Sequence, residues 1–225
     1  MTKLLLQTYY RHDSNKEDKN VGCYIPVDDL AKDSERRFRI YAESIGADYL
    51  MIDAPPWENR PEPAWARFKM FDLCLDGGYD EVCYVDADIL PSKRSLGISI
   101  FNEGGHGKLT ERDEGSKASW HINFGVVKFN AAECRKLKWK VFDKKYIKWL
   151  EQTGKNQDPG NEMFYQTFRK RPKPLSPVWN MTRKYHRTDF DPIGGYWAHY
   201  IGHQKIGNGN QWGCMKTDPV YLEKW

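Results

Sequence analysis

Two carboxylates stand directly after an apolar run in this sequence. Residues 82–85 (VCYV) are followed by Asp86 and, two positions later, by Asp88. Side chains at positions i and i+2 of an extended strand point to the same face, so both carboxylates could bind one ligand. A divalent cation would remove the repulsion between them, and oxygen ligands favour Mg²⁺ or Mn²⁺, which can neutralise phosphates. The alternative is that one Asp caps the next turn and the other is solvated.

Alternating strand and helix patterns surround this carboxylate pair. We expect strands at residues 3–10, 47–53 and 81–85, a helix from Asp33 or Ser34 to about Ile45, and a helix from Ala64 to Leu75. This order predicts an α/β fold with a central, mostly parallel sheet flanked by helices. Ligands of such sheets bind outside the carboxyl ends of the strands, which is where the two aspartates fall.

The second half of the chain is less regular. It predicts a strand at 122–130, a Lys-rich helix from Asn130 to about Leu150 with Glu133 in a capping box, and a short helix that begins at Asp158 and Pro159. Residues 171–225 carry little periodicity. Because we find no repeat and no linker, we expect a single domain over residues 1–225.

The composition limits the kinds of molecule that the protein is expected to bind. The net charge of +4 arises from 35 basic and 31 acidic residues, a balance that argues against nucleic acid and favours small anionic ligands. The nine Trp and 13 Tyr side chains could pack in the core or stack on planar ligands. We see no signal peptide, integral membrane segment or sustained heptad, and expect a cytoplasmic protein, bacterial or viral. The five cysteines form no CxxC pair, so we expect them to be reduced and structural.

Four segments of the chain together resemble a known enzyme family. Residues 84–90 (YVDADIL), with the helix before them, are similar to the DxD region of nucleotide-sugar glycosyltransferases of the GT-A fold, most closely the glycogenin and lipopolysaccharide galactosyltransferase family. Residues 121–130 (HINFGVVKFN), 176–182 (SPVWNMT) and 198–205 (AHYIGHQK) resemble later motifs of that family in the same order. The resemblance implies a Rossmann-like GT-A domain, with a nucleotide-binding half over about 1–90 and an acceptor half over about 91–225.

The resemblance implies a metal site at the carboxylate pair. Asp86 and Asp88 would bind Mn²⁺ or Mg²⁺, and His199 would be the third protein ligand. Ala87, between the two aspartates, would contact the donor. Imidazole is a reasonable ligand for Mn²⁺. Without the resemblance, His199 would be read as an ordinary core or surface histidine.

The same resemblance implies a diphosphate beside the metal. Lys205 and the backbone at Gly202 would contact the diphosphate of the donor. A metal and an ammonium group stabilise the charge that develops on the leaving nucleoside diphosphate, so Lys205 would act in turnover as well as in binding. Residues 205–212 (KIGNGNQW) depart from the family pattern, and Trp212 could cover the site instead.

Further residues match the positions that hold the donor in this family. Asn123 would hydrogen-bond the donor sugar, and Gly125 would let it approach the backbone. The nucleotide and its phosphates would be received by Thr8, Tyr9, Tyr10, Arg67 and Lys69. The alternatives are core packing for the tyrosines and a solvated helix face for the two basic residues.

Residues 159–166 (PGNEMFYQ) stand where the family carries an Asp-Gln motif. Asn161 and Glu162 are therefore the candidates for orienting the sugar or the acceptor. Glu162 could also be a base or a nucleophile, and Glu162 or Asp158 would serve as the base of an inverting enzyme.

Taken together, the sequence predicts a metal-dependent glycosyltransferase. It would move a sugar from a nucleotide-sugar donor, UDP-linked, to a glycan or another hydroxyl acceptor, with retention of configuration. Two rival hypotheses are a phosphohydrolase with Asp86 as nucleophile and Asp88 as acid, and a sugar-nucleotide-binding module without turnover.

Overall fold

The structure is a computed structural model of the chain. It describes residues 1–9, 27–54, 57, 63–109, 122–153, 159–182, 195–200 and 219–225. Tyr10, Asp158, Gly202, Lys205 and Trp212 lie outside these residues, so the expectations that concern them stay predictions.

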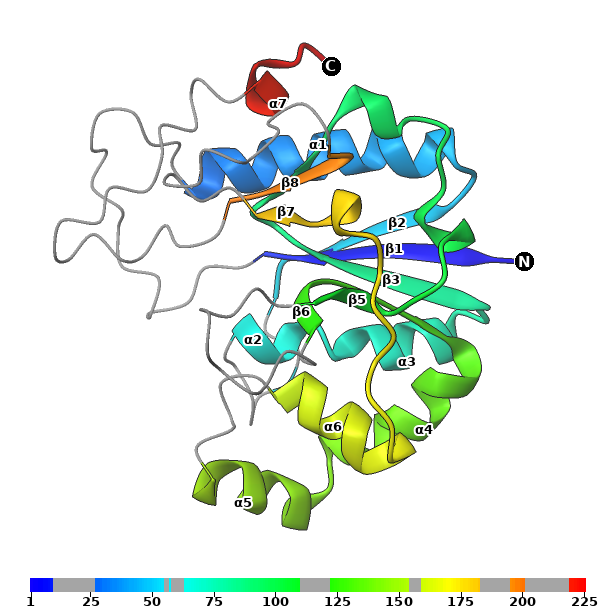
Figure 1. Cartoon of the computed structure of the whole chain (residues 1–225), viewed down its shortest axis with the longest axis vertical. Coiled ribbons are helices and arrows are strands. Elements are labelled where there is room, and N and C mark those ends of the chain that lie inside the picture. Colours follow the sequence, from blue (N-terminus) through cyan, green and yellow to red (C-terminus); the bar gives the residue numbers. More distant parts are fainter. Residues whose placement is uncertain are drawn as a thin grey trace, which may run out of the picture.

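A five-stranded sheet forms the centre of the fold (Figure 1). Its strands, in spatial order, are β2 (Asp48–Ile52), β1 (Lys3–Thr8), β3 (Glu81–Asp86), β6 (Ile122–Asn130) and β5 (Gly107–Leu109). β1 pairs in parallel with β2 and β3, whereas β6 is antiparallel to both β3 and β5. Every strand except β6 therefore runs in the same direction, which confirms the predicted mostly parallel sheet.

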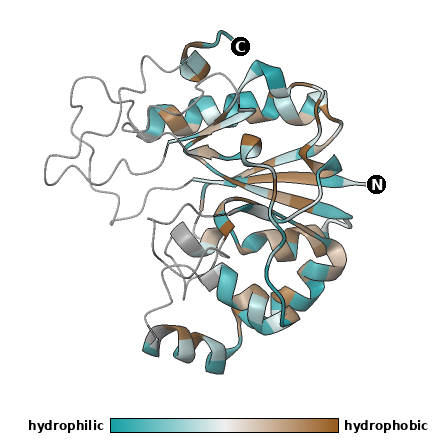
Figure 2. Ribbon diagram, in the orientation of Figure 1, coloured by the Kyte–Doolittle hydropathy of each residue, from teal (hydrophilic) through white to brown (hydrophobic). Residues whose placement is uncertain are grey.

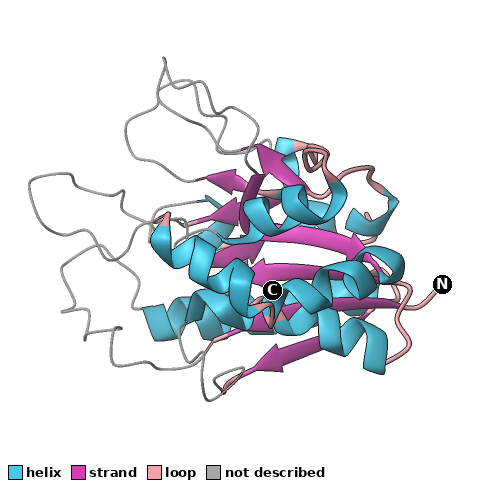
Figure 3. Cartoon of the chain, turned by 90° about the horizontal axis from the view of Figure 1, so that it is seen from below, coloured by secondary structure: helices cyan, strands magenta, loops and turns pink. Residues whose placement is uncertain are grey.

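Helices cover both faces of this sheet (Figures 1 and 3). α1 (Val27–Ser44) lies on one face, and the other face is covered by α3 (Lys69–Asp76), α4 (Ala131–Val141) and α6 (Pro159–Phe168). The remaining helices are α2 (Pro63–Ala66), α5 (Lys144–Gln152), α7 (Pro219–Leu222) and the 3₁₀ turns η1 (Lys93–Ser95), η2 (Ile100–Asn102) and η4 (Pro177–Trp179).

The pleat of the central strands divides the core in two. Leu4 and Leu6 of β1 pack with α3, α4 and α6, while Leu5 packs with Phe38 and Tyr41 of α1. A strand that is covered on both faces is apolar along its whole length, which explains the runs at 4–6 and 82–85. Figure 2 shows this concentration of apolar residues on the central strands.

A second, smaller sheet places the later motifs beside the carboxylate pair. It consists of β4 (Ile89–Pro91), β8 (Trp197–His199) and β7 (Met181–Thr182), with β8 in the middle. β8 pairs antiparallel with β4, so that His199 lies opposite Ile89. A residue more than a hundred positions away is thereby brought next to Asp88.

Three helix boundaries differ from the sequence expectation. α1 begins by Val27 rather than at Asp33 or Ser34, because Ser34 is buried inside the helix and bonds Gln7 and the Ile89 carbonyl instead of capping. The expected helix 64–75 is divided into α2 and α3.

The Lys-rich segment likewise forms two helices, because Asp143 accepts hydrogen bonds from the backbone N–H groups of Lys145 and Tyr146 and so caps α5. The capping box of Asn130 and Glu133 at the start of α4 is present as predicted. The three cysteines in the described residues, Cys74, Cys83 and Cys134, are free and buried. Within the part of the chain that the structure describes, no helix has the length and apolar character needed to cross a bilayer.

Candidate metal centre

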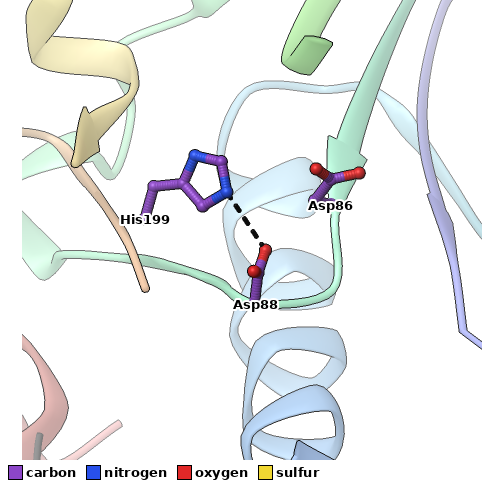
Figure 4. Close-up of side chains that lie close together, drawn as sticks. All are labelled: Asp86, Asp88 and His199. Atoms are coloured by element: carbon purple, nitrogen blue, oxygen red, sulfur yellow. Dashed lines mark ion pairs between the residues drawn. The ribbon is translucent and has the colours of Figure 1, made fainter. Parts of the chain in front are cut away.

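Asp86, Asp88 and His199 meet at the carboxyl end of β3. Asp86 is the last residue of this strand, Asp88 lies in the turn before β4, and His199 ends β8. One ligand atom from each side chain lies within 4.8 Å of the others, and Nε2 of His199 is 3.3 Å from Oδ1 of Asp88. Figure 4 shows the two carboxylates and the ring turned toward one another. Two carboxylates and an imidazole are a donor set that suits Mn²⁺.

The electrostatics of Asp86 favour the binding of a cation. Burial raises the pKa of Asp86 above its usual range; Arg67, whose guanidinium nitrogen is 3.6 Å from Oδ1 of Asp86, lowers it, and the negative charge of Asp88 raises it further. The ionised pair therefore carries an unfavourable energy in the absence of additional positive charge. A divalent cation would remove this cost.

The Nδ1 side of the His199 ring contacts a chain of hydrogen-bonded side-chain amides, Asn180 and Asn123. Its Nδ1 is 2.7 Å from Oδ1 of Asn180, and Nδ2 of Asn180 donates to Oδ1 of Asn123 at 3.1 Å. The backbone N–H of Gly125 donates to that same oxygen at 2.8 Å. Asn180 belongs to the Trp-Asn segment recognised in the sequence, but no role was assigned to it there, because nothing in the local pattern indicates a contact with His199.

The predicted nucleotide side lies at the end of β1. Thr8 is the register partner of Asp86, and its hydroxyl is 3.0 Å from the Tyr84 hydroxyl. The hydroxyl of Tyr9 donates to the carboxylate of Asp28 in α1. Thr8 therefore lies beside Asp86, while the phenol of Tyr9 is directed to α1.

The two basic candidates of the DxD helix region differ in position. The guanidinium group of Arg67 lies at Asp86 and over the ring of Tyr84, with 5.6 Å to the ring centroid. The amine of Lys69 is 3.5 Å from the Asp72 carboxylate and lies over the Trp57 ring. Of the two, Arg67 is the one that the structure brings to the carboxylate pair.

The Asn161 amide bonds the backbone of β6 on both sides. Its Oδ1 accepts from the Ile122 N–H and its Nδ2 donates to the Ile122 carbonyl, both at 2.9 Å. Asn161 is fully buried, so these contacts give it a structural role in joining α6 to β6. Glu162, the next residue, is also buried.

Comparison with known proteins identifies the fold. No family model matches the sequence, and no curated protein matches it. A glycosyltransferase involved in the glycosylation of the major capsid of PBCV-1 aligns with a TM-score of 0.51 and 13% identity, over 90% of this chain and 94% of that chain. The glycosyltransferase GlyE of Streptococcus pneumoniae TIGR4 aligns with a TM-score of 0.54 and 16% identity, over the whole of this chain.

This chain spans 61% of the length of the GlyE structure. The galactosyltransferase LgtC, in complex with donor and acceptor sugar analogs, aligns with a TM-score of 0.47 and 16% identity, over 88% of this chain and 87% of that chain. The first two alignments show that the chain has the fold of GT-A glycosyltransferases, as the sequence resemblance predicted.

Proposed function

We propose that this protein is a metal-dependent glycosyltransferase that moves a sugar from a UDP-linked donor to a hydroxyl group of a glycan or another acceptor. The observation that carries the proposal is the convergence of Asp86, Asp88 and His199 at the carboxyl end of β3 in a glycosyltransferase fold. Ligands of α/β sheets bind at this edge, and the donor set suits Mn²⁺ or Mg²⁺.

In this proposal the three side chains hold the cation, which neutralises charge on the diphosphate when it is bound. We assign Arg67 to an anionic oxygen of the donor, and its position 3.6 Å from Oδ1 of Asp86 supports this assignment. We assign Lys205 and the backbone at Gly202 to the same diphosphate on the resemblance alone. We also propose one domain, whose nucleotide-binding half ends at about residue 90 and whose acceptor half follows.

The remaining assignments concern the sugar and the nucleotide. Thr8, Tyr9 and Tyr10 receive the base and ribose, and Asn123 donates to the donor sugar. Retention of configuration is the stereochemistry that we propose, with attack on the face from which the phosphate leaves. Product of inverted configuration, lost on Glu162→Gln, would replace this mechanism by one with Glu162 as general base.

Calorimetric titration of UDP, with GDP in parallel, tests the donor site. We expect UDP binding in the presence of Mn²⁺, none in EDTA, and none for Asp88→Asn. Asp76→Asn removes the same charge from the exposed end of α3 and should bind UDP as the wild type does. Binding would then be followed by a screen of UDP-sugars for transfer.

Each rival hypothesis has its own outcome. Phosphate release from simple phosphomonoesters, without hydrolysis of any nucleotide sugar, would establish the phosphohydrolase. Tight metal-dependent UDP binding without a product from any donor and acceptor pair would establish the binding module. If neither nucleotide binds in a metal-dependent way, the proposed metal site is wrong.

A further inference from the structure

A buried hydrogen-bonded chain runs from the backbone of β6 to the back of His199. It passes from the Gly125 N–H to Asn123 Oδ1 (2.8 Å), from Asn180 Nδ2 to the same oxygen (3.1 Å), and from Asn180 Oδ1 to His199 Nδ1 (2.7 Å). Asn180 is 0% exposed and His199 is 3% exposed. These hydrogen bonds join β6 to β8 through Asn180, the residue that follows η4.

The direction of every hydrogen bond in this chain follows from its first member. A backbone N–H can only donate, so Asn123 must turn its oxygen toward Gly125. That oxygen can only accept, so Asn180 must present its NH₂ group to Asn123 and its own oxygen to His199. The Asn180 oxygen can only accept in turn, so Nδ1 of His199 must carry a proton.

This reasoning determines which ring nitrogen is available to a metal. A neutral imidazole protonated at Nδ1 has its lone pair on Nε2. Nε2 is the atom that faces the carboxylates, 3.3 Å from Asp88 Oδ1. The opposite tautomer would direct an N–H toward the cation and leave the buried Asn180 oxygen without a donor, which is costly.

We infer that Asn180 is a positioning residue, which, through Asn123, fixes the tautomer and orientation of His199 so that Nε2 can bind a divalent cation. The inference rests on the proposed metal site and deepens it. Residues that orient a metal-binding histidine in this way typically change metal affinity about 10–100-fold when they are removed. Asn180 acts only through His199, so its effect must disappear when His199 is absent.

A double-mutant cycle on Mn²⁺ binding tests this coupling. The dissociation constant of Mn²⁺ is measured from the free Mn²⁺ signal in electron paramagnetic resonance, with UDP present. We expect Asn180→Ala to weaken binding by about 10–100-fold in the wild type, and to change it less than about threefold in His199→Ala, because coupled positions are not additive.

The protonation of the two His199 ring nitrogens can be measured by NMR without metal. In ¹⁵N-labelled protein without metal, the ring nitrogens of His199 are assigned by their absence in His199→Ala. We expect Nδ1 to carry a proton in the wild type, whether or not Nε2 also holds one toward Asp88, and this proton to be lost or shared between the two nitrogens in Asn180→Ala. Asn180→Asp still offers an oxygen to Nδ1 but sets a second acceptor against Oδ1 of Asn123, so it should keep the proton on Nδ1 while lowering the melting temperature.

A matched control separates positioning from a general loss of structure. Asn130→Ala removes the side-chain cap of α4, a contact outside the chain to His199, so it should lower the melting temperature without changing Mn²⁺ affinity. A fall in affinity for Asn130→Ala equal to that for Asn180→Ala would show that both act through stability, and would overturn the inference.

The outcomes distinguish this inference from the proposed function. If the wild type binds Mn²⁺ no better than Asp88→Asn, the metal site fails. If Asp88→Asn abolishes binding while Asn180→Ala binds as the wild type does, the metal site stands and the role of Asn180 is wrong. The Nε2–H tautomer in the wild type without metal would also overturn it.

Discussion

At the scale of the residue, the absence of a side chain at Gly125 allows His199 to take its place at the carboxylates. A Cβ atom built at Gly125 would lie 2.3 Å from Cε1 of His199 and 2.8 Å from Oδ1 of Asn123, well inside van der Waals contact. Because both neighbours are held by hydrogen bonds, neither can move without breaking the amide chain. Glycine is therefore needed here for close approach of the ring.

The change Gly125→Ala should displace His199 and weaken Mn²⁺ binding by about 10-fold or more, the loss expected when a metal ligand is misplaced. Overpacking should also lower the free energy of unfolding by about 1–3 kcal/mol. Calorimetric titration with Mn²⁺ and urea unfolding measure the two effects. Gly104→Ala is the control, since a Cβ there meets open space. Wild-type Mn²⁺ affinity in Gly125→Ala would show that the ring position is not critical.

At the same scale, the residues differ in how far the sequence predicts them. Asp86 and Asp88 are visible as a pair after an apolar strand, and the resemblance adds His199. The partner of Asn180 is not visible, because it depends on the pairing of β8 with β4 and β7, which no local period encodes. For the same reason the contacts of Asn161 with the Ile122 backbone were not expected.

At the scale of the element, the start of α4 is predicted because the two side chains that cap it lie close together in the sequence. The Asn130 and Glu133 capping box lies three residues apart in sequence and is present at α4. The division of the next segment at Asp143 was not predicted, because the Lys-rich pattern is compatible with one continuous helix. The hydrogen bonds from the Lys145 and Tyr146 N–H groups to Asp143, which begin α5, do not alter that pattern. Ser34 was expected to cap a helix but lies inside α1, because its hydroxyl bonds Gln7 and the Ile89 carbonyl, which are distant in sequence.

The α4 cap gives a prediction for the pH dependence of stability. Burial raises the pKa of Glu133, but hydrogen bonds from His106 and the Asn130 N–H bring it below its ordinary value overall. A carboxyl whose pKa is depressed on folding stabilises the protein above its unfolded pKa, about 4.3, and this stabilisation is lost as pH falls through the folded value. Glu133→Gln keeps the shape and removes the charge.

We therefore expect Glu133→Gln to lower the free energy of unfolding by about 0.5–1.5 kcal/mol at pH 7, and the difference from the wild type to shrink below about pH 4. Urea unfolding at pH 7, 5 and 3.5 measures it. Glu43→Gln, at an exposed position of α1, should stay within about 0.5 kcal/mol of the wild type throughout. A difference that grows on acidification would contradict the assigned role.

At the scale of the whole molecule, the last described segment of the chain joins the helix layer to the strand that follows Asp88. Val220 packs with Leu30 of α1, Leu90 of β4 and the residues around His199 in one buried cluster. The Glu223 carboxylate accepts hydrogen bonds from the Ser92 hydroxyl and the Lys93 N–H just after β4. Residues 219–225 are held by such contacts rather than by a repeated apolar face, which is why no helical or strand period marks them in the sequence.

Arg37 is the centre of this connection. It is 1% exposed, its guanidinium donates to the carbonyls of Val220 (2.6 Å) and Tyr221 (2.8 Å), and it pairs with Asp33 at 2.8 Å. Arg37→Met would preserve much of the packing volume but remove the guanidinium that donates to both carbonyls and pairs with Asp33. We expect the free energy of unfolding to fall by about 1.5–3 kcal/mol, the range for hydrogen bonds that involve a charged group.

The matched change is Arg39→Met on the same helix. The side chain of Arg39 is 57% exposed and pairs with Glu35, a contact of the kind that contributes about 0–1 kcal/mol. In both pairs the arginine lies four positions after its acidic partner in the same helix. Urea unfolding of the two variants therefore compares a buried arginine with an exposed one. Because the segment that Arg37 holds packs against β4 and β8, Arg37→Met should weaken Mn²⁺ binding as well, whereas Arg39→Met should not. Equal stability losses would show that the chain end is not anchored by Arg37.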